Sequence, residues 1–219
     1  MITYEQIIKS EEINAYIKRA DQSLAALGYT EHSFAHITRV AKMTEYILKT
    51  IGESEKNTQL AKIAAHLHDL GNVINRIDHS QSSALMAFRI LDHLSMPAED
   101  IATVISAIGN HDEGTGVPID NISAALILAD KSDVRRSRVR NGDISSFDIH
   151  DRVNYSVIAS DIVINDARDT ITLTLEIDTA YGSIMDYFEI FMQRMLLCRK
   201  AAEKLGLSFK LVINNQPLI

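Results

Sequence analysis

Two histidines and a carboxylate lie close together in residues 64–71 (AAHLHDLG), at the end of an apolar helical pattern. The pair His68-Asp69 has an ordinary explanation, in which buried polar groups form local hydrogen bonds beside a helix that ends at Gly71. The same pair is also typical of a metal site. Imidazole nitrogen combined with carboxylate oxygen suits the transition metals that activate water, whereas an all-carboxylate set suits calcium or magnesium.

Further candidate ligands along the chain favour the metal interpretation. His36 lies upstream, and His79 and His111 lie downstream. Asp130 lies within the almost entirely apolar residues 122–132, which predict a central buried helix. An unpaired buried carboxylate is costly, so Asp130 is a ligand candidate on physical grounds alone.

The order His36, then His68-Asp69, then Asp130 resembles the HD superfamily of metal-dependent phosphohydrolases, over about residues 31–140. The resemblance implies one or two divalent transition metal ions (Mn, Fe, Zn, Ni or Co, with Mg also considered), and it makes His68 and Asp69 the catalytic residues. The first ion would be held by His36, His68, Asp69 and Asp130, and Asp69 would bridge to a second ion held partly by His79 and His111.

Two positions depart from the family pattern. Asn72 stands where a lysine commonly follows in the family, and an amide can donate a hydrogen bond but carries no charge. Residues 113–118 resemble a shortened Gly-Tyr-Pro loop of the HD-GYP subgroup, with Val117 in the tyrosine position. That subgroup typically has two adjacent histidines where this chain has Asn110-His111. We therefore do not carry over a cyclic-dinucleotide substrate.

Basic residues follow Asp130 and predict an anion-recognising rim. Lys131, Arg135, Arg136, Arg138 and Arg140 are five of the 22 Lys and Arg residues of an acidic chain. A solvated helix end, with cations opposing the macrodipole, is the alternative. Arg135 and Arg138 would share a helix face if the helix of Asp130 continued. The complete set of substrate-binding candidates is Arg39, Asn72, Arg135, Arg138 and His32.

His32 and Arg39 enter this set through their positions around His36. Arg39 belongs to the His-x-x-Arg-Val setting that the family uses. His32 lies four residues before His36, on the same helix face, where it either faces substrate or is a plain surface histidine.

Hydrophobic periodicity predicts the elements that carry these residues. Helical patterns cover about residues 4–27, 31–51, 54–68, 80–94, 101–109 and 122–132. Past residue 142 the pattern changes to strands at 155–165 and 170–177, a turn at 166–169, a helix at 181–205 and a strand at 207–213. We expect a mainly α fold, an HD-type helical bundle (residues 1–142) with a small C-terminal α+β subdomain of β-β-α-β order (residues 143–219).

Composition limits the functional classes. A net charge of -7 argues against a general binder of nucleic-acid polymers or membrane surfaces. The single cysteine, Cys198, cannot form an intrachain disulfide, and no apolar run approaches a membrane span or signal peptide. We expect a cytoplasmic protein with a small phosphorylated substrate, and an exposed sheet edge that could pair in a homodimer.

Three functions are compatible with these residues. The leading hypothesis is a phosphohydrolase that uses metal-activated water on a phosphomonoester, phosphodiester or phosphoanhydride of a nucleotide or related small molecule. The second is a non-catalytic nucleotide- or metal-sensing module, favoured by Asn72 and by the missing histidine beside His111. The third is a di-iron oxygenase, because a minority branch of the superfamily uses the same ligands for oxygen chemistry.

Overall fold

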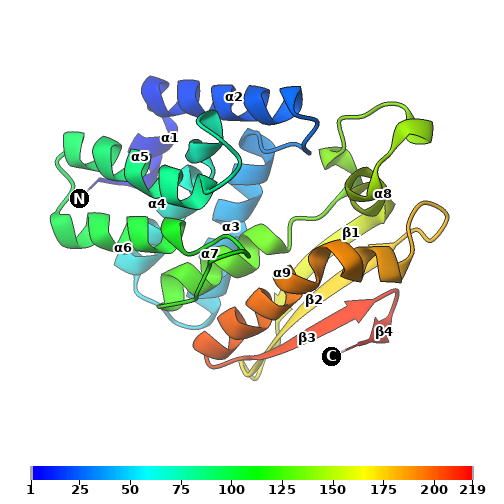
Figure 1. Cartoon of the computed structure of the whole chain (residues 1–219). Helices are drawn as coiled ribbons and strands as arrows, with labels where there is room; N and C mark the ends of the chain where they lie inside the picture. Colours follow the sequence, from blue (N-terminus) through cyan, green and yellow to red (C-terminus); the bar gives the residue numbers. More distant parts are fainter. Residues whose placement is uncertain (1, 219) are drawn as a thin grey trace.

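A helical part and a smaller sheet-containing part lie side by side in the computed structural model, which describes residues 2–218 (Figure 1). Residue 1, where the expected helical domain begins, and residue 219, where the expected C-terminal subdomain ends, lie outside the described range. The helical part contains α1 (Tyr4–Ile8), α2 (Glu11–Ala26), α3 (Phe34–Thr50), α4 (Glu55–Leu67), the 3-10 turn η1 (Leu70–Val73), α5 (His79–His93), α6 (Ala98–Gly109) and α7 (Asn121–Lys131). The expected fold class, mainly helical with a small α+β part, is confirmed.

Side-chain caps set where several of these helices begin. The single helix expected over residues 4–27 is wrong, because two helices occupy this segment. Thr3 caps α1 with a capping box, and the Ser10 side chain accepts a hydrogen bond from the N–H of Ile13 and starts α2. Apolar periodicity continues through the break between the two helices, so it did not reveal the break.

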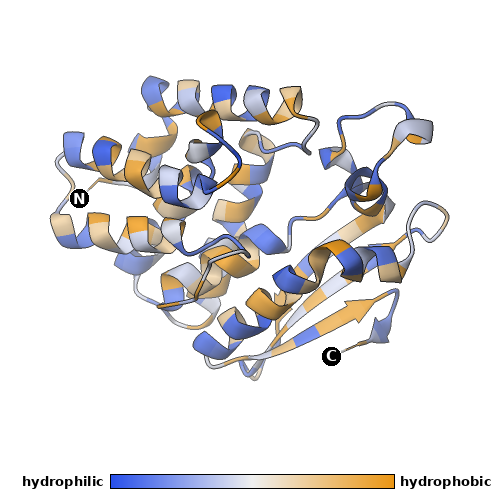
Figure 2. Cartoon of the chain, in the orientation of Figure 1, coloured by the Kyte–Doolittle hydropathy of each residue, from blue (hydrophilic) through white to orange (hydrophobic). Residues whose placement is uncertain are grey.

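Helix α7 lies at the centre of the helical part, as its sequence predicted. Its residues from Ile122 to Ala129 are all at most 3% exposed, and it packs against α3, α4 and α6 on one side and against α9 on the other. The surrounding helices turn apolar faces inward, and Figure 2 shows hydrophobic and hydrophilic residues alternating along them. Burial of these faces is the main source of stability for the bundle.

The C-terminal part is a four-stranded sheet, in the order β1-β2-β3-β4, with two helices, α8 (Ile149–Ser156) and α9 (Ile184–Lys204). Its strands are β1 (Val157–Ile164), β2 (Thr170–Ile177), β3 (Ser208–Ile213) and β4 (Gln216–Pro217). The pair β1 and β2 is antiparallel, β2 and β3 are parallel, and α9 connects them across one face (Figure 1). β1 and β4 are the edge strands.

Two features of this part differ from the expected β-β-α-β order. The first strand begins at Val157 and not at Tyr155, because α8 continues through Ser156. Asp148 caps that helix by accepting a hydrogen bond from the N–H of Asp151, a start that the strand pattern obscured. The short strand β4 was not expected. Within residues 2–218, no helix combines the length and apolarity needed to cross a bilayer.

Candidate metal centre

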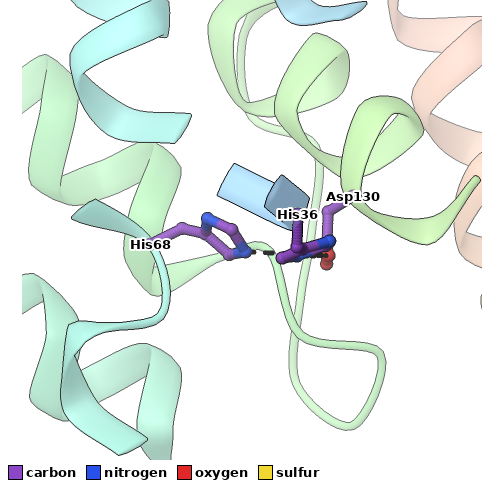
Figure 3. Close-up of side chains that lie close together, drawn as sticks. All are labelled: His36, His68 and Asp130. Atoms are coloured by element: carbon purple, nitrogen blue, oxygen red, sulfur yellow. Dashed lines mark ion pairs between the residues drawn. The ribbon is translucent and has the colours of Figure 1, made fainter. Parts of the chain in front are cut away.

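Ligand-type atoms from three helices converge beside α7. His36 projects from α3, His68 from the end of α4 and Asp130 from α7 (Figure 3). His36 Nε2 is 3.3 Å and His68 Nε2 is 3.7 Å from Asp130 Oδ1. Each of the three residues offers one ligand atom, and these atoms lie within 4.8 Å of one another. This spacing allows all three side chains to bind one ion.

Asp69 lies between this group and a second one. Its Oδ2 is 3.2 Å from His68 Nε2 and 3.8 Å from His36 Nε2, whereas its Oδ1 is 3.5 Å from His79 Nε2. His111, just after α6, offers a further nitrogen within 4.8 Å of ligand atoms of His68 and Asp69. The two oxygens of one carboxylate thus face different histidines, the arrangement that a bridging ligand requires.

Backbone packing fixes the approach of His79 to Asp69. The N–H of Gly71, in η1, donates to Ser83 Oγ at 2.7 Å. A Cβ at Gly71 would lie 2.3 Å from the His79 carbonyl oxygen and 2.6 Å from the Ser83 nitrogen. Only glycine therefore allows η1 to contact the first turn of α5 this closely.

Each candidate histidine is oriented through its Nδ1. The acceptors are Asp133 Oδ2 for His36 (2.7 Å), the Ala65 carbonyl for His68 (2.8 Å), the Arg76 carbonyl for His79 (3.0 Å) and the Ile108 carbonyl for His111 (2.6 Å). These bonds place a proton on Nδ1 and leave the lone pair of Nε2 as the one that can bind a metal ion. The Nε2 atoms of His36, His68 and His111 are buried and have no hydrogen-bond partner among the described residues. A metal ion fits this donor set, because it would satisfy three otherwise orphaned nitrogens.

The charges of the site are balanced locally. Burial alone would raise the pKa of Asp69, but the neighbouring His68 holds it well below its usual range. Burial would likewise raise the pKa of Asp130, but Lys131, whose Nζ is 2.8 Å from Asp130 Oδ2, together with His36 and His68 holds it well below its usual range. Burial lowers the pKa of His68, yet the two carboxylates together raise it to about 10. Without metal, His68 therefore holds a second proton, on Nε2, which offsets part of the negative charge at neutral pH and which a bound ion would displace.

A pocket of about 450 Å³ lies over these residues, between the two parts of the molecule. Asp69, His79 and Asp130 line it from the helical part. Its other walls include residues 27–30 and 32 before α3, the cationic side chains of Arg76, Lys131, Arg138 and Arg194, and residues 148, 150, 151 and 154 of α8 and its cap. The C-terminal part thus closes one side of the pocket, a contribution that the sequence did not suggest.

Residues 33–136 match the family model of the HD domain. The chain contains an HD domain. Membership of the HD superfamily, expected from the order of His36, His68-Asp69 and Asp130, is therefore confirmed.

Proteins similar to this HD-domain protein include an uncharacterized relative and a protein of solved structure. It is 27% identical over 160 residues to the uncharacterized protein MJ1020 of Methanocaldococcus jannaschii, an alignment that covers 63% of this chain and 61% of that protein. The chain thus spans about three fifths of the length of this relative. A solved structure, a predicted HD superfamily hydrolase from an uncultured Thermotogales bacterium, matches with a TM-score of 0.45 and 25% identity, over 57% of this chain and 67% of that chain.

The substrate-binding candidates of the HD-domain protein separate into two groups. His32 and Arg138 line the pocket. Arg39 and Arg135 instead line a groove between α3 and β1, and both bind the carboxylate of Asp133, at 3.2 and 2.9 Å. The expected shared helix face of Arg135 and Arg138 is wrong, because α7 ends at Lys131 and Arg135 is extended.

Asn72 is buried beneath the pocket and does not line it. Its Nδ2 donates to Asp69 Oδ1 at 2.9 Å and to the Asp69 carbonyl at 3.0 Å. The amide therefore orients a ligand carboxylate of the HD domain from behind, in place of the direct substrate contact that we expected.

The residues that only the structure places at the site include Asp133, Arg76, Asp112 and Glu113. Asp133 supports His36, and Arg76 lies near Asp69. Asp112 Oδ1 is 3.9 Å from His79 Nε2. Glu113 binds both Lys131 and Arg194, at 2.6 and 2.9 Å. Only Asp112 and Glu113, which adjoin His111, have sequence positions that hinted at a role.

Proposed function

We propose that this HD-domain protein is a metal-dependent phosphohydrolase that cleaves a phosphomonoester, phosphodiester or phosphoanhydride of a nucleotide or related small molecule. The main support is the buried set of unpartnered His Nε2 atoms and carboxylates beneath a pocket with cationic walls. A divalent ion held by these residues would lower the pKa of a bound water and neutralise charge on phosphoryl oxygens.

The protein groups have distinct tasks in this proposal. His36, His68 and Asp130, with Asp69 Oδ2, would hold the first ion. Asp69 Oδ1, with His79 and His111, would face the second. The Nδ1 hydrogen bonds fix the histidine rings before any ion binds, which lowers the reorganisation that binding requires.

The pocket supports a small substrate. Its volume of about 450 Å³ falls within the range of small-molecule sites, roughly 300–1,000 Å³. The cationic side chains on its walls are suited to an anionic group. Asp148 and Asp151, which also line the pocket, offer carboxylates to the remainder of the substrate. A homodimer through an exposed sheet edge and a cytoplasmic site of action stay predictions.

A reconstitution experiment tests the function. Protein stripped with a chelator is reloaded with Mn, Fe, Zn, Ni, Co or Mg and assayed against a panel of phosphomonoesters, diesters and nucleotides, with Asp69→Ala as the inactive control. Release of phosphate or a nucleoside monophosphate that depends on both the metal and Asp69 is the expected result. Absence of product with every metal would refute the hydrolase. Tight nucleotide binding without product would then favour the sensing module, and oxygen consumption by the iron-loaded protein would favour the oxygenase.

A further inference from the structure

Arg76 presents a guanidinium to the pocket from the loop between η1 and α5. Its side chain is 22% exposed, and its Nη1 lies 4.0 Å from Asp69 Oδ1. The same nitrogen is 3.4 Å from Asn72 Oδ1, and the guanidinium carbon is 6.0 Å from the Tyr29 ring centroid. Arg76 is therefore a pocket cation adjacent to the carboxylate that faces both groups of histidines.

The other Lys and Arg side chains of the pocket are more tightly bound to protein groups. Lys131 binds two carboxylates, at 2.6 and 2.8 Å. Arg138 donates to two main-chain carbonyls, at 2.6 and 2.8 Å. Arg194 donates to Glu113 at 2.9 Å and lies over the Phe191 ring. Among residues 2–218, Arg76 has no hydrogen-bond partner closer than 3.4 Å, so most of its five donors are free to bind a ligand.

We propose that Arg76 binds the phosphoryl group of the substrate, and that Asn72 orients it. This inference rests on the proposed phosphohydrolase function. A planar guanidinium can donate two parallel hydrogen bonds to one oxyanion, which gives both charge and orientation. Asn72 holds Asp69 through its Nδ2 and accepts from Arg76 through its Oδ1, so one amide aligns the guanidinium with the ligand carboxylate.

The backbone of Arg76 has a separate task. Its carbonyl oxygen accepts hydrogen bonds from the His79 N–H at 3.3 Å and from His79 Nδ1 at 3.0 Å. A side-chain substitution keeps this carbonyl, so the orientation of His79 should survive it. Loss of the guanidinium can therefore be separated experimentally from loss of metal.

The experiment compares Arg76→Ala and Arg76→Lys with the wild-type protein, using inorganic phosphate as the probe. Calorimetry measures phosphate binding to metal-loaded protein, elemental analysis measures metal per chain, and steady-state kinetics uses whichever substrate the panel yields. Arg89→Ala is the matched control, because Arg89 is an exposed arginine on α5 whose side chain is 73% accessible. Thermal melts verify that each variant is folded.

We expect Arg76→Ala to weaken phosphate binding and kcat/KM by roughly ten- to a hundredfold, with unchanged metal content. Arg76→Lys should recover only part of the loss, since an ammonium keeps the charge without the planar fork. Arg89→Ala should behave as wild type.

Three outcomes would overturn the proposal. They are wild-type phosphate affinity in Arg76→Ala, loss of metal from that variant, or a loss of phosphate binding that appears in Arg194→Ala instead. If wild-type protein hydrolyses nothing, yet binds phosphate in a manner that requires Arg76, the hydrolase function fails and the anion site stands.

Discussion

Replacing Asp133 with asparagine should weaken metal binding without removing any ligand. The Asp133 carboxylate is 1% exposed, and its Oδ2 accepts from His36 Nδ1 at 2.7 Å. Three arginines surround it, with nitrogens of Arg39, Arg135 and Arg138 at 3.2, 2.9 and 3.7 Å. Asparagine preserves the shape of the side chain but removes the charge that polarises the His36 ring.

The structure allows the size of the effect to be estimated. Loss of a carboxylate partner behind a metal-bound histidine typically costs about 10–100-fold in metal affinity. The stability of the metal-free protein should also fall, by roughly 1.5–3 kcal/mol, the range for one buried hydrogen bond to a charged group. The His36 and Arg138 contacts dominate this loss. The Arg39 side chain is 40% exposed and that of Arg135 is 23% exposed, so solvent screens their contributions.

The pH dependence of this loss has a definite sign. Burial alone would raise the pKa of Asp133, but the hydrogen bond from His36 and the charge of Arg138 hold it well below its ordinary value of 3.8. A carboxyl with a depressed folded pKa stabilises the fold above its unfolded pKa, and this stability is lost as pH falls toward the folded value. The stability difference between wild type and Asp133→Asn should be full at pH 7 and shrink below about pH 4.

Calorimetric metal titration, together with urea unfolding of metal-free protein between pH 3 and pH 7, measures both quantities. Asp133→Ala serves as the more severe comparison, because it also removes the acceptor oxygen. Wild-type metal affinity in Asp133→Asn would refute the supporting role of Asp133. A stability difference that stays constant down to pH 3 would refute the electrostatic reasoning.

Four further predictions concern the ligands and the extent of the site. Asp69→Ala should abolish turnover and lower metal content, because each oxygen faces a different group of histidines; full occupancy with normal turnover would contradict this. His79→Ala or His111→Ala should remove only the second ion, and two ions per chain in both variants, by elemental analysis, would show that these histidines are misassigned. The pKa of His68 is raised to about 10, so below that pH a bound ion must displace a proton from His68. Metal binding should therefore release a proton, and metal affinity should rise with pH. Calorimetry in buffers of different ionisation enthalpy measures the release, and its absence would disprove the prediction. A fragment ending at Gly142 should stay helical and bind metal, although it exposes the α7 face that α9 covers; a soluble helical fragment without metal affinity would argue against this.

Local patterns in the sequence predicted most of the helical part. Apolar periodicity located the helices, and Gly28 and Gly52 end α2 and α3 in the left-handed conformation, with φ of 82° and 84°. The predicted end of α7, residue 132, lies within one residue of the observed end, but the sequence did not exclude a helix beyond it, because neither glycine nor proline follows Lys131. A helix continued past that residue would have placed Arg135 and Arg138 together, and the structure separates them.

The supporting contacts of the site could not be predicted because they join distant positions. His36 and Asp133 are 97 residues apart, and Glu113 and Arg194 are 81 apart. No spacing rule relates such residues, since their proximity depends on how α3, α7 and α9 pack. The family resemblance supplied an ordered set of ligands, but it did not indicate which arginine faces the pocket or which carboxylate orients a histidine.

The close contact at Gly71 has a consequence for metal selectivity. Because η1 rests directly on the first turn of α5, the main chain dictates how far His79 lies from Asp69. Substitutions around the ligands can change the charge of the centre and its affinity for metal. The distance between His79 and Asp69 is instead set by the contact between the backbones of η1 and α5. Discrimination between ions of different radius would then depend on how these two backbone segments pack. Replacing one type of ligand side chain with another would leave the backbone distance between positions 69 and 79 unchanged.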